Sequence, residues 1–475
     1  MSWQTFILHF FTYGILLYSL ILLICYVLIG AFSISETRSY LHKNSFTDYR
    51  LLASSTETPS MSILAPAYNE GANIIENVRS LLSLHYNNLE VIIINDGSKD
   101  DSLEKLIRAY DMYKVDFFVG QQVKTKPVRG VYKSYNPVYR KLIVIDKENG
   151  GKADALNVGV NIASNDYFVC IDVDCVLEQD ALLKLAKPFL EGANQRVIAA
   201  GGVVRIANSC VIEGGRLVKV NLPKQFLPRI QTLEYIRAFL LSRMAWTKLN
   251  GLLLISGAFG AFDREIVINC GGYNTNTVGE DMELVVRMRR YMEERDEPYK
   301  VAFIPDPLCW TEAPSTFKIL GRQRNRWTRG TIETLRFHKV MLFNPRYGIL
   351  GMLSYPYWLF FEFLAPIIEF FGTIGLIIYC FTYAINWSAI LIMIGVLCMG
   401  ILYSIFAIMM EVLTYNQYKE RKDILRLVGV AILEPFIFHP FVVWSAIRGN
   451  IDLIRKRNSW GEMTRQGFAA EKKVS

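Results

Sequence analysis

The segment Asp166–Asp180, DYFVCIDVDCVLEQD, contains the pattern that decides the fold. A short apolar run, Tyr167–Ile171, ends in Asp172-Val-Asp174, so two acidic residues stand one residue apart at the end of an expected buried strand. Carboxylates avoid such positions unless they are paired or bind a cation. If the strand continues through them, alternation directs both carboxylates to the same side.

Two carboxylates this close repel each other, and one pKa rises unless a divalent cation lies beside them. Mg²⁺ or Mn²⁺ is the natural cation, because both are hard, prefer oxygen ligands and bridge carboxylates to phosphates. The sequence therefore predicts a metal site formed by Asp172 and Asp174, with a diphosphate held by the metal.

Three other β-rich runs share this arrangement of an apolar strand followed by polar residues: MSILAPAYNE at 61–70, LEVIIINDGS at 89–98 and LIVIDKENGG at 142–151. Residues 73–84 and 152–163 have apolar positions at helical spacing. This alternation predicts an α/β fold with a mostly parallel, doubly wound sheet.

Ligands of such sheets bind at the carboxyl ends of the strands. We therefore expect the polar residues that follow the strands to converge on one cleft: Tyr68, Asn69, Glu70, Asp96, Lys152, Asp172 and Asp174. Taken alone, Asp96-Gly97 also fits an ordinary turn, and Tyr68–Glu70 and Lys152 also fit helix starts.

Two later motifs add charged residues. VGEDMELVVRM at 278–288 places Glu280 and Asp281 at the start of a helix, where acids also serve as partners of the helix dipole. In RQRNRWTRG at 322–330, a helix would carry an amide, a guanidinium and an indole on one face, from Gln323, Arg326 and Trp327. The same segment also fits a basic amphipathic helix on a membrane surface.

The chain of 475 residues is 52% apolar, and these residues are unevenly distributed. Residues 6–34 are almost uncharged and exceed the roughly 20 residues that a membrane helix needs. They have neither the basic start nor the cleavage site of a signal peptide, so an uncleaved anchor is expected. Arg38, Lys43 and Arg50 follow the anchor and no Lys or Arg precedes it, which places the globular insert in the cytoplasm.

Residues 360–385 and 387–413 read as two further crossings, followed by the basic loop YKERKDILR at 418–426. The segment 425–447 contains two prolines, a glutamate and a histidine and makes a poor spanning helix. The basic tail from Arg448 is expected in the cytoplasm, which requires an even number of crossings after the insert. Either 425–447 lies in the interface or 347–385 crosses an additional time.

The remaining composition excludes several classes of protein. The eight cysteines form no CxxC pair and no metal spacing with histidine, so they read as apolar fillers. The net charge of +8 fits a membrane-proximal face and an anionic nucleotide substrate. The sequence has no nucleic-acid-binding pattern.

Taken together and in order, these motifs resemble those of the family 2 glycosyltransferases. These are the inverting, membrane-integrated, processive synthases of cellulose, chitin, hyaluronan and poly-N-acetylglucosamine. The family signature matches over roughly 60–330 as Asp96, Asp172-Val-Asp174, Gly279-Glu280-Asp281 and Gln323-Arg-Asn-Arg326-Trp327. Gly279 departs from the Thr or Ser that is usual in the family.

The resemblance implies roles for the donor-side residues. Tyr68, Glu70 and Asp96 would contact uracil and ribose, and Lys152 would lie near the diphosphate. Asp172 and Asp174 would bind the nucleotide and a Mg²⁺ or Mn²⁺ ion, with Asp174 as the direct ligand. A tail motif, SWGEMTR, adds Trp460 and Arg465 as residues that close the site over UDP, although the segment also fits an interfacial helix.

The resemblance also implies the chemistry. Asp281, beside Glu280, would be the general base that deprotonates the acceptor hydroxyl. Arg326 and the metal would stabilise the leaving diphosphate. Gln323 would contribute to both donor and acceptor binding, and Trp327 would stack on the acceptor sugar.

The implied architecture has five parts: an anchor at 1–34, a linker at 35–59, a cytoplasmic GT-A domain at 60–330, interfacial and transmembrane helices at 331–447, and a cytoplasmic tail at 448–475. Within the GT-A domain, the nucleotide-sugar half covers about 60–180 and the acceptor half about 181–330.

The expected function is processive polymerisation of a UDP-sugar at the cell membrane, with export of the glycan. UDP-GlcNAc is the first choice of donor, since the layout is most similar to poly-N-acetylglucosamine synthases; hyaluronan- and cellulose-type synthesis are alternatives. A non-processive transferase acting on a lipid and a catalytically silent scaffold also remain. Expected partners are the glycan acceptor, membrane lipid and an accessory membrane subunit.

Overall fold

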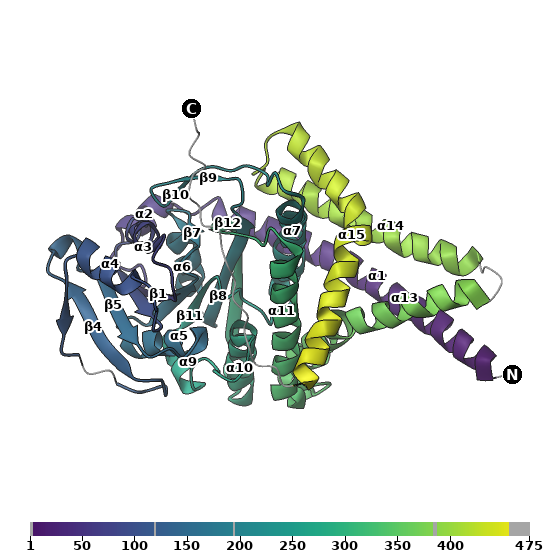
Figure 1. Cartoon of the computed structure of the whole chain (residues 1–475), viewed down its shortest axis with the longest axis horizontal. Helices are drawn as coiled ribbons and strands as arrows, with labels where there is room; N and C mark the ends of the chain where they lie inside the picture. The colour runs from purple at the N-terminus through teal and green to yellow at the C-terminus, as the bar shows by residue number, and fades with distance from the viewer. Residues whose placement is uncertain (1–2, 118–119, 193–194, 383–386, 456–475) are drawn as a thin grey trace.

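The computed structural model describes residues 3–117, 120–192, 195–382 and 387–455. A domain built on a β-sheet occupies one side of the molecule, and three long helices project from the other side (Figure 1). These helices are α1 (Trp3–Asn44), α13 (Ala365–Thr382) and α14 (Trp387–Thr414).

The sheet has ten strands in the described residues, in the order β3-β4-β5-β2-β1-β6-β11-β8-β12-β7. The neighbours β5, β2, β1 and β6 are parallel, and β11 lies antiparallel between β6 and β8. The predicted α/β fold is confirmed, and the sheet is mixed. The strand bounds are β1 Met61–Ala67, β2 Leu89–Asn95, β3 Met112–Val115, β4 Val128–Ser134, β5 Leu142–Lys147, β6 Tyr167–Ile171, β7 Val176–Leu177, β8 Arg196–Ile206, β11 Phe259–Asp263 and β12 Tyr299–Thr311, with a separate hairpin of β9 Val211–Glu213 and β10 Arg216–Lys219.

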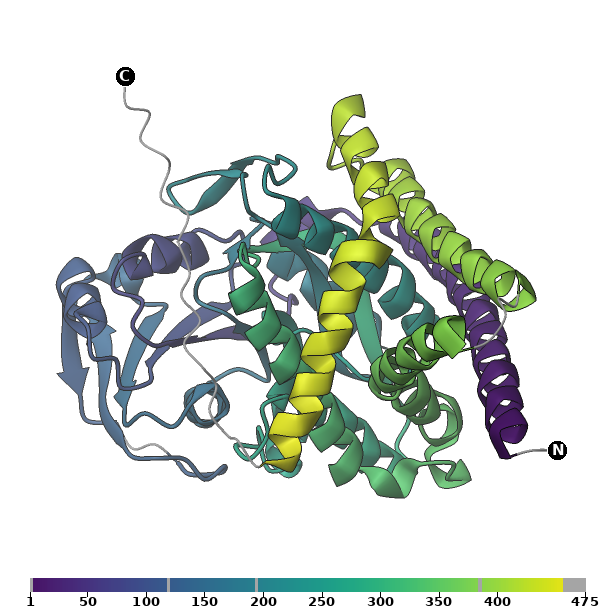
Figure 2. The same ribbon diagram turned by 45° about the vertical axis from the view of Figure 1, so that its right-hand side comes forward.

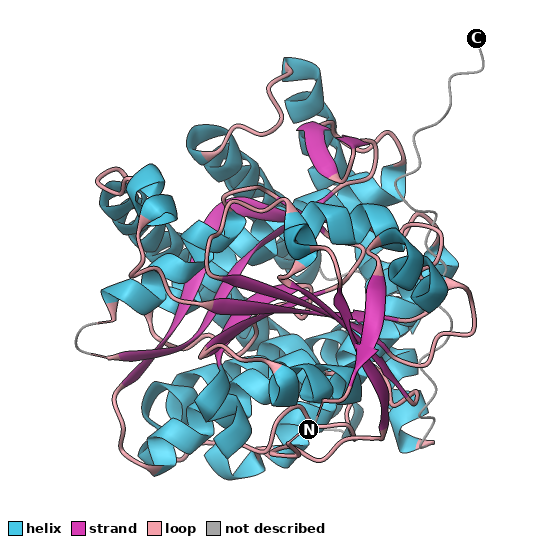
Figure 3. Cartoon of the chain, turned by 90° about the vertical axis from the view of Figure 1, so that its left-hand side faces the viewer, coloured by secondary structure: helices cyan, strands magenta, loops and turns pink. Residues whose placement is uncertain are grey.

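Helices cover both faces of the sheet (Figure 3). This explains why the central strands are continuous apolar runs, since a parallel sheet is buried on both sides. Ile92, Ile93 and Ile94 of β2, for example, are all fully buried. The α-helices of this domain are α2 Tyr49–Ser54, α3 Ile74–Leu82, α4 Ser102–Ala109, α5 Lys152–Ile162, α6 Ala181–Glu191, α7 Phe226–Ile236, α8 Met244–Lys248, α9 Arg264–Asn269, α10 Glu280–Glu294 and α11 Phe317–Phe337.

Four helices among the described residues are long and apolar enough to cross a membrane: Leu17–Asn44, Leu350–Gly375, Met393–Thr414 and Arg421–Ile454. Helix α1 extends to Asn44, so the first ten residues of the expected linker continue the anchor helix. The reason is that no glycine or proline stands between Gly30 and Pro59 to end the helix.

Helix α15 (Arg421–Ile454) is continuous through Pro435 and Pro440. It lies along α11 and runs steeply across α13 and α14 (Figures 1 and 2). Its Glu434 pairs with Arg237 of the sheet domain at 3.1 Å. By length and composition α15 could cross a membrane, so the interfacial position of residues 425–447 stays a prediction.

Candidate active site

The polar residues expected to form the site follow four neighbouring parallel strands at their carboxyl ends. β1 is followed by Tyr68 and Glu70, β2 by Asp96, β5 by the loop to Lys152, and β6 by Asp172. Tyr68 is 45% exposed and the Glu70 backbone N–H donates to Ser102 Oγ at 3.1 Å. The carboxyl ends of the four strands therefore lie next to one another at one edge of the sheet.

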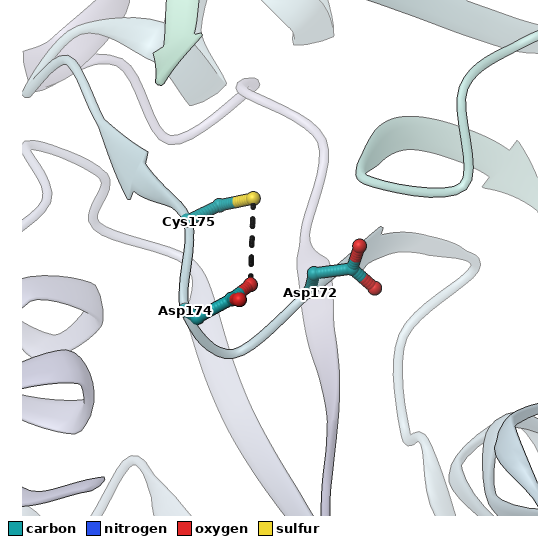
Figure 4. Close-up of side chains that lie close together, drawn as sticks. All are labelled: Asp172, Asp174 and Cys175. Atoms are coloured by element: carbon teal, nitrogen blue, oxygen red, sulfur yellow. Dashed lines mark hydrogen bonds between the residues drawn. The ribbon is translucent and has the colours of Figure 1, made fainter. Parts of the chain in front are cut away.

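The two acids of the opening segment leave from a turn rather than from a strand. β6 ends at Ile171, and the Cys175 N–H donates to the Asp172 carbonyl at 2.9 Å, which closes the turn. Asp172 consequently points away from Asp174 and Cys175 (Figure 4). The alternation expected for a strand that continues through both acids therefore does not apply, because β6 ends at Ile171.

These residues nevertheless fit a hard divalent cation. Ligand atoms of Asp172, Asp174 and Cys175 lie within 4.8 Å of one another. A hydrogen bond with Cys309 and burial raise the pKa of Cys175 well above its usual range, so its thiol donates to Asp174 Oδ1 at 3.9 Å instead of acting as a thiolate ligand. The two carboxylates are the hard oxygen donors that suit Mg²⁺ or Mn²⁺.

Lys152, the first residue of α5, connects this pair to the acceptor half. Its Nζ donates to the Asp172 carboxylate and to the Gly257 carbonyl, the latter at 3.0 Å. Burial alone would lower the pKa of Lys152, but the neighbouring Asp172 and Glu280 carboxylates, Cys170 and the hydrogen bond to Asp172 together raise it. The lysine is therefore a permanent cation beside the acids.

Gly257 joins Lys152 to Asp281. Its N–H donates to Asp281 Oδ2 at 2.9 Å, while its carbonyl accepts from Lys152. A Cβ atom at this position would lie 3.1 Å from Asp281 Oδ2 and 3.3 Å from Lys152 Nζ, tighter than ordinary contacts. No role was predicted for Gly257, since only the folded chain brings residues 152, 257 and 281 together.

Glu280 and Asp281 begin α10, as predicted. Asp281 Oδ1 also accepts the N–H of Met282 at 2.8 Å. Burial and the neighbouring Asp281 raise the pKa of Glu280, against the opposing effects of Lys152 and Arg326. Glu280 is therefore influenced by a cation from each of two helices, Lys152 of α5 and Arg326 of α11.

Gly279 explains how α10 and α11 meet. A Cβ atom on Gly279 would lie only 2.6 Å from Gly330 Cα, so the two backbones touch where a side chain would not fit. This contact accounts for glycine at the position where the resembling family usually has Thr or Ser.

We expect Gly279→Thr to lower turnover at least about tenfold, because α11 must move away and carry Arg326 with it; a displacement of about 1 Å at a reacting centre costs this much or more. Gly120→Ala is the control, since a Cβ atom there meets nothing within 4 Å. Steady-state release of the nucleotide from the sugar donor measures the effect. Equal turnover in both variants would contradict this role of the glycine contact.

Gln323, Arg326 and Trp327 lie on α11, as the helical spacing predicts. Trp327 is 40% exposed, and the guanidinium of Arg324 lies 4.1 Å from the centroid of its ring. The Oε1 atom of Gln323 is buried without a hydrogen-bond partner in the described residues. Trp460 and Arg465 lie outside the residues that the structure describes.

Lys147 is a residue of the site that the sequence interpretation missed. Its fully buried Nζ lies 2.7 Å from Asp96 Oδ1 and 2.7 Å from Asp154 Oδ2. The N–H groups of Gly150 and Gly151 also donate to Asp96, at 2.9 and 2.8 Å. Asp96 is thus held in one orientation by its own chain. The signal in the sequence is a lysine that ends the apolar run 142–147.

Comparisons with known proteins agree with this geometry. A family model described as "Glycosyl transferase family 2" matches residues 62–209, and one described as "Glycosyl transferase family group 2" matches residues 167–410, more than half of the chain. The poly-beta-1,6-N-acetyl-D-glucosamine synthase of Staphylococcus aureus (strain COL) is 29% identical over 280 residues, 59% of this chain and 56% of the relative. The synthase of the same name from a Staphylococcus epidermidis strain is 30% identical over 281 residues, with the same shares. The chain thus spans just over half the length of the curated relatives it matches.

Among solved structures, the chain is similar to the mannosyltransferase PcManGT from Pyrobaculum calidifontis, a complex with GDP-Man and Mn²⁺. The TM-score is 0.50 at 17% identity, and the match covers 86% of this chain and 99% of the other. At this level of identity, the likeness shows the fold, a mixed α/β sheet of the GT-A type.

Proposed function

Because the chain belongs to the family 2 glycosyltransferases, we propose that it is a membrane-bound hexosyltransferase that polymerises UDP-GlcNAc into poly-N-acetylglucosamine and exports the polymer. The observation that carries this proposal is the hydrogen-bonded series Asp172–Lys152–Gly257–Asp281, which links the expected diphosphate end of the donor to the expected base. The names of the staphylococcal relatives support the choice of sugar.

On the donor side, Tyr68, Glu70 and Asp96 bind uracil and ribose at the ends of β1 and β2. Lys152 binds the diphosphate, and its ion pair with Asp172 supports this role. Asp172 and Asp174 would hold a Mg²⁺ or Mn²⁺ ion, and the Mn²⁺ in the PcManGT complex is consistent with this. When bound, the ion neutralises negative charge on the diphosphate.

The transfer is a single displacement. Asp281 accepts the proton of an acceptor hydroxyl while that oxygen attacks the anomeric carbon from the side opposite UDP. The new C–O bond forms as the bond to the diphosphate breaks, so the configuration inverts and UDP leaves. The N–H groups of Gly257 and Met282 hold the two oxygens of Asp281 in position. Arg326 stabilises charge on the departing group, and Gln323 and Trp327 bind the acceptor sugar.

Polar pairs within the apolar helices support export of the polymer. His439 Nε2 lies 2.6 Å from Glu369 Oε2, which joins α15 to α13. Arg237 reaches Ser404 of α14 at 2.9 Å and also pairs with Glu434. Ionisable residues in membrane segments generally face a polar path or the interior of the bundle. We propose that the glycan moves along this path, with the catalytic domain in the cytoplasm.

Product analysis tests the proposal. The purified full-length chain in detergent is given UDP-GlcNAc, UDP-Glc and UDP-GlcA with Mg²⁺, Mn²⁺ or a chelator, and UDP release is recorded together with product size. We expect long polymer from UDP-GlcNAc alone, lost with the chelator. A polymer that requires UDP-GlcA would mean hyaluronan-type alternation, and one made from UDP-Glc would mean cellulose-type synthesis. A single sugar on a co-purified lipid would replace the polymerase with a lipid transferase, and no UDP release would remove the proposed activity.

A further inference from the structure

Glu333 of α11 accepts two hydrogen bonds from the loop that leads into α10. Its Oε2 atom accepts from the Thr277 hydroxyl at 2.7 Å and from the Val278 N–H at 3.0 Å. The hydroxyl oxygen of the buried Thr277 accepts in turn from the N–H of Gly279, at 3.1 Å. One carboxylate therefore fixes the three residues that precede the acid pair.

The start of α10 depends on these bonds because the helix lacks a capping side chain. Gly279 is its N-cap residue and makes no side-chain hydrogen bond to the first turn. Helices are usually fixed at this end by an N-cap side chain that accepts a backbone N–H. With glycine at this position, the loop before the helix determines the place of the first turn, which contains Glu280 and Asp281.

The same loop is attached to α5 at its other end. The side chain of Asn157 donates to the Tyr273 carbonyl at 2.9 Å and accepts from the Tyr273 N–H at 2.6 Å. Residues 275–276, between the two attachments, are exposed. The loop is thus held by α5, which begins with Lys152, and by Glu333 of α11.

Glu333 also lies on the face of α11 that meets α10. Arg326, Gly330 and Glu333 follow one another at spacings of four and three residues, and side chains so spaced share one face of a helix. Gly330 contacts Gly279 on this face. The hydrogen bonds of Glu333 therefore join the helix that carries Arg326 to the residues that precede Asp281.

We propose that Glu333 is a positioning residue for the transfer reaction: its two hydrogen bonds hold the start of α10, and therefore Asp281, in place relative to Arg326. The role rests on the proposed function, in which Asp281 is the base. Glu333 acts as a hydrogen-bond acceptor and not through its charge, because both bonds end on one oxygen atom, which the amide oxygen of glutamine can replace.

The test compares Glu333→Met, which keeps the length of the side chain and removes both acceptor oxygens, with Glu333→Gln, which keeps one. We expect Glu333→Met to lower kcat for UDP release about tenfold or more, since a displacement of about 1 Å at a reacting centre costs this much. The donor KM should stay within about twofold, and Glu333→Gln should retain at least about half of the turnover. Glu104→Met, at an exposed position of α4, is the control.

Thr277→Val should resemble Glu333→Met, because it removes the hydroxyl that joins Glu333 to Gly279. The double variant Glu333→Met/Thr277→Val should lose less than the product of the two single losses, since both changes break the same contact.

Hydrogen exchange of the backbone amides, read by mass spectrometry in a peptide covering residues 272–281, tests the role without turnover. The N–H groups of Val278 and Gly279 should exchange at least about tenfold faster in Glu333→Met than in the wild type and in Glu333→Gln. Val278 loses its acceptor, and the Thr277 hydroxyl loses the group that orients it. This difference would support the role of Glu333 even if the wild type were inactive with every donor.

Three outcomes would overturn the role. The first is an unchanged kcat or unchanged exchange in Glu333→Met; with polymer made by the wild type, this would retain the proposed function and remove the positioning residue. The second is an equal loss in Glu333→Gln, which would assign the effect to the charge. The third is faster exchange throughout the sheet domain with a matching loss of thermal stability, which would mean a structural role alone.

Discussion

Asp281→Asn should abolish turnover while UDP still binds within about twofold of the wild-type affinity. The amide cannot accept the proton of the acceptor hydroxyl, and general-base catalysis by a positioned carboxylate is worth about 10²–10⁴-fold in rate. One of its two backbone contacts would also be lost, because an NH₂ group cannot accept from Gly257 or Met282. UDP release in a coupled assay, beside calorimetry with UDP and metal, measures both quantities.

The matched control is Asp296→Asn, which changes an exposed aspartate whose positive φ of 55° asparagine adopts readily. It should leave turnover unchanged. Retained turnover in Asp281→Asn would remove this residue from the role of base. Glu280→Gln would then be the next variant, since Glu280 is buried beside Asp281 and faces Lys152 and Arg326.

The parts of the site that could be predicted are those set by local pattern. Apolar strands followed by polar residues gave the strand ends of β1, β2 and β6, because a buried parallel strand must be continuously apolar. Helical spacing gave the shared helix of Gln323, Arg326 and Trp327, and the start of α10 at Glu280. Each of these features depends on residues a few positions apart.

The parts that could not be predicted depend on contacts between distant segments. The hydrogen bond from Lys152 to Gly257 joins residues 105 positions apart in the sequence, and the one from Gly257 to Asp281 joins residues 24 positions apart. The contact of Gly279 with Gly330 also arises only when two helices meet. The orientation of Asp172 could not be predicted from alternation, because period-two alternation holds only while the strand lasts and here a turn begins at the first acid.

In residues 331–455, composition located the apolar segments but did not indicate how the helices pack against one another. Pro435 and Pro440 argued against a long helix, yet α15 passes through both. Neighbouring helices re-satisfy the backbone groups that a proline leaves unpaired, which is why such helices survive in membranes. The position of α15 against α11 is a tertiary contact and left no periodic signal.

Lys147→Met should produce the largest loss of stability of any single change in the site. The ammonium group is fully buried between Asp96 and Asp154, whose side chains are 4% and 7% exposed. Its removal leaves two carboxylates in an enclosed site without a cation, and breaking a buried ion pair in this way costs about 3–5 kcal/mol. Denaturant unfolding in detergent measures the loss, and Lys114→Met on the exposed side of β3 is the control.

The double variant Lys147→Met/Asp154→Asn separates stability from donor binding. Removing the charge of Asp154 should return part of the lost stability, since only one buried carboxylate then lacks its cation. Both variants should bind UDP more weakly than the wild type. Lys147 helps to orient Asp96, together with the N–H groups of Gly150 and Gly151, and both variants lack it. If UDP binds normally to either variant, Lys147 serves the fold alone, and the two glycine N–H groups are sufficient to position Asp96.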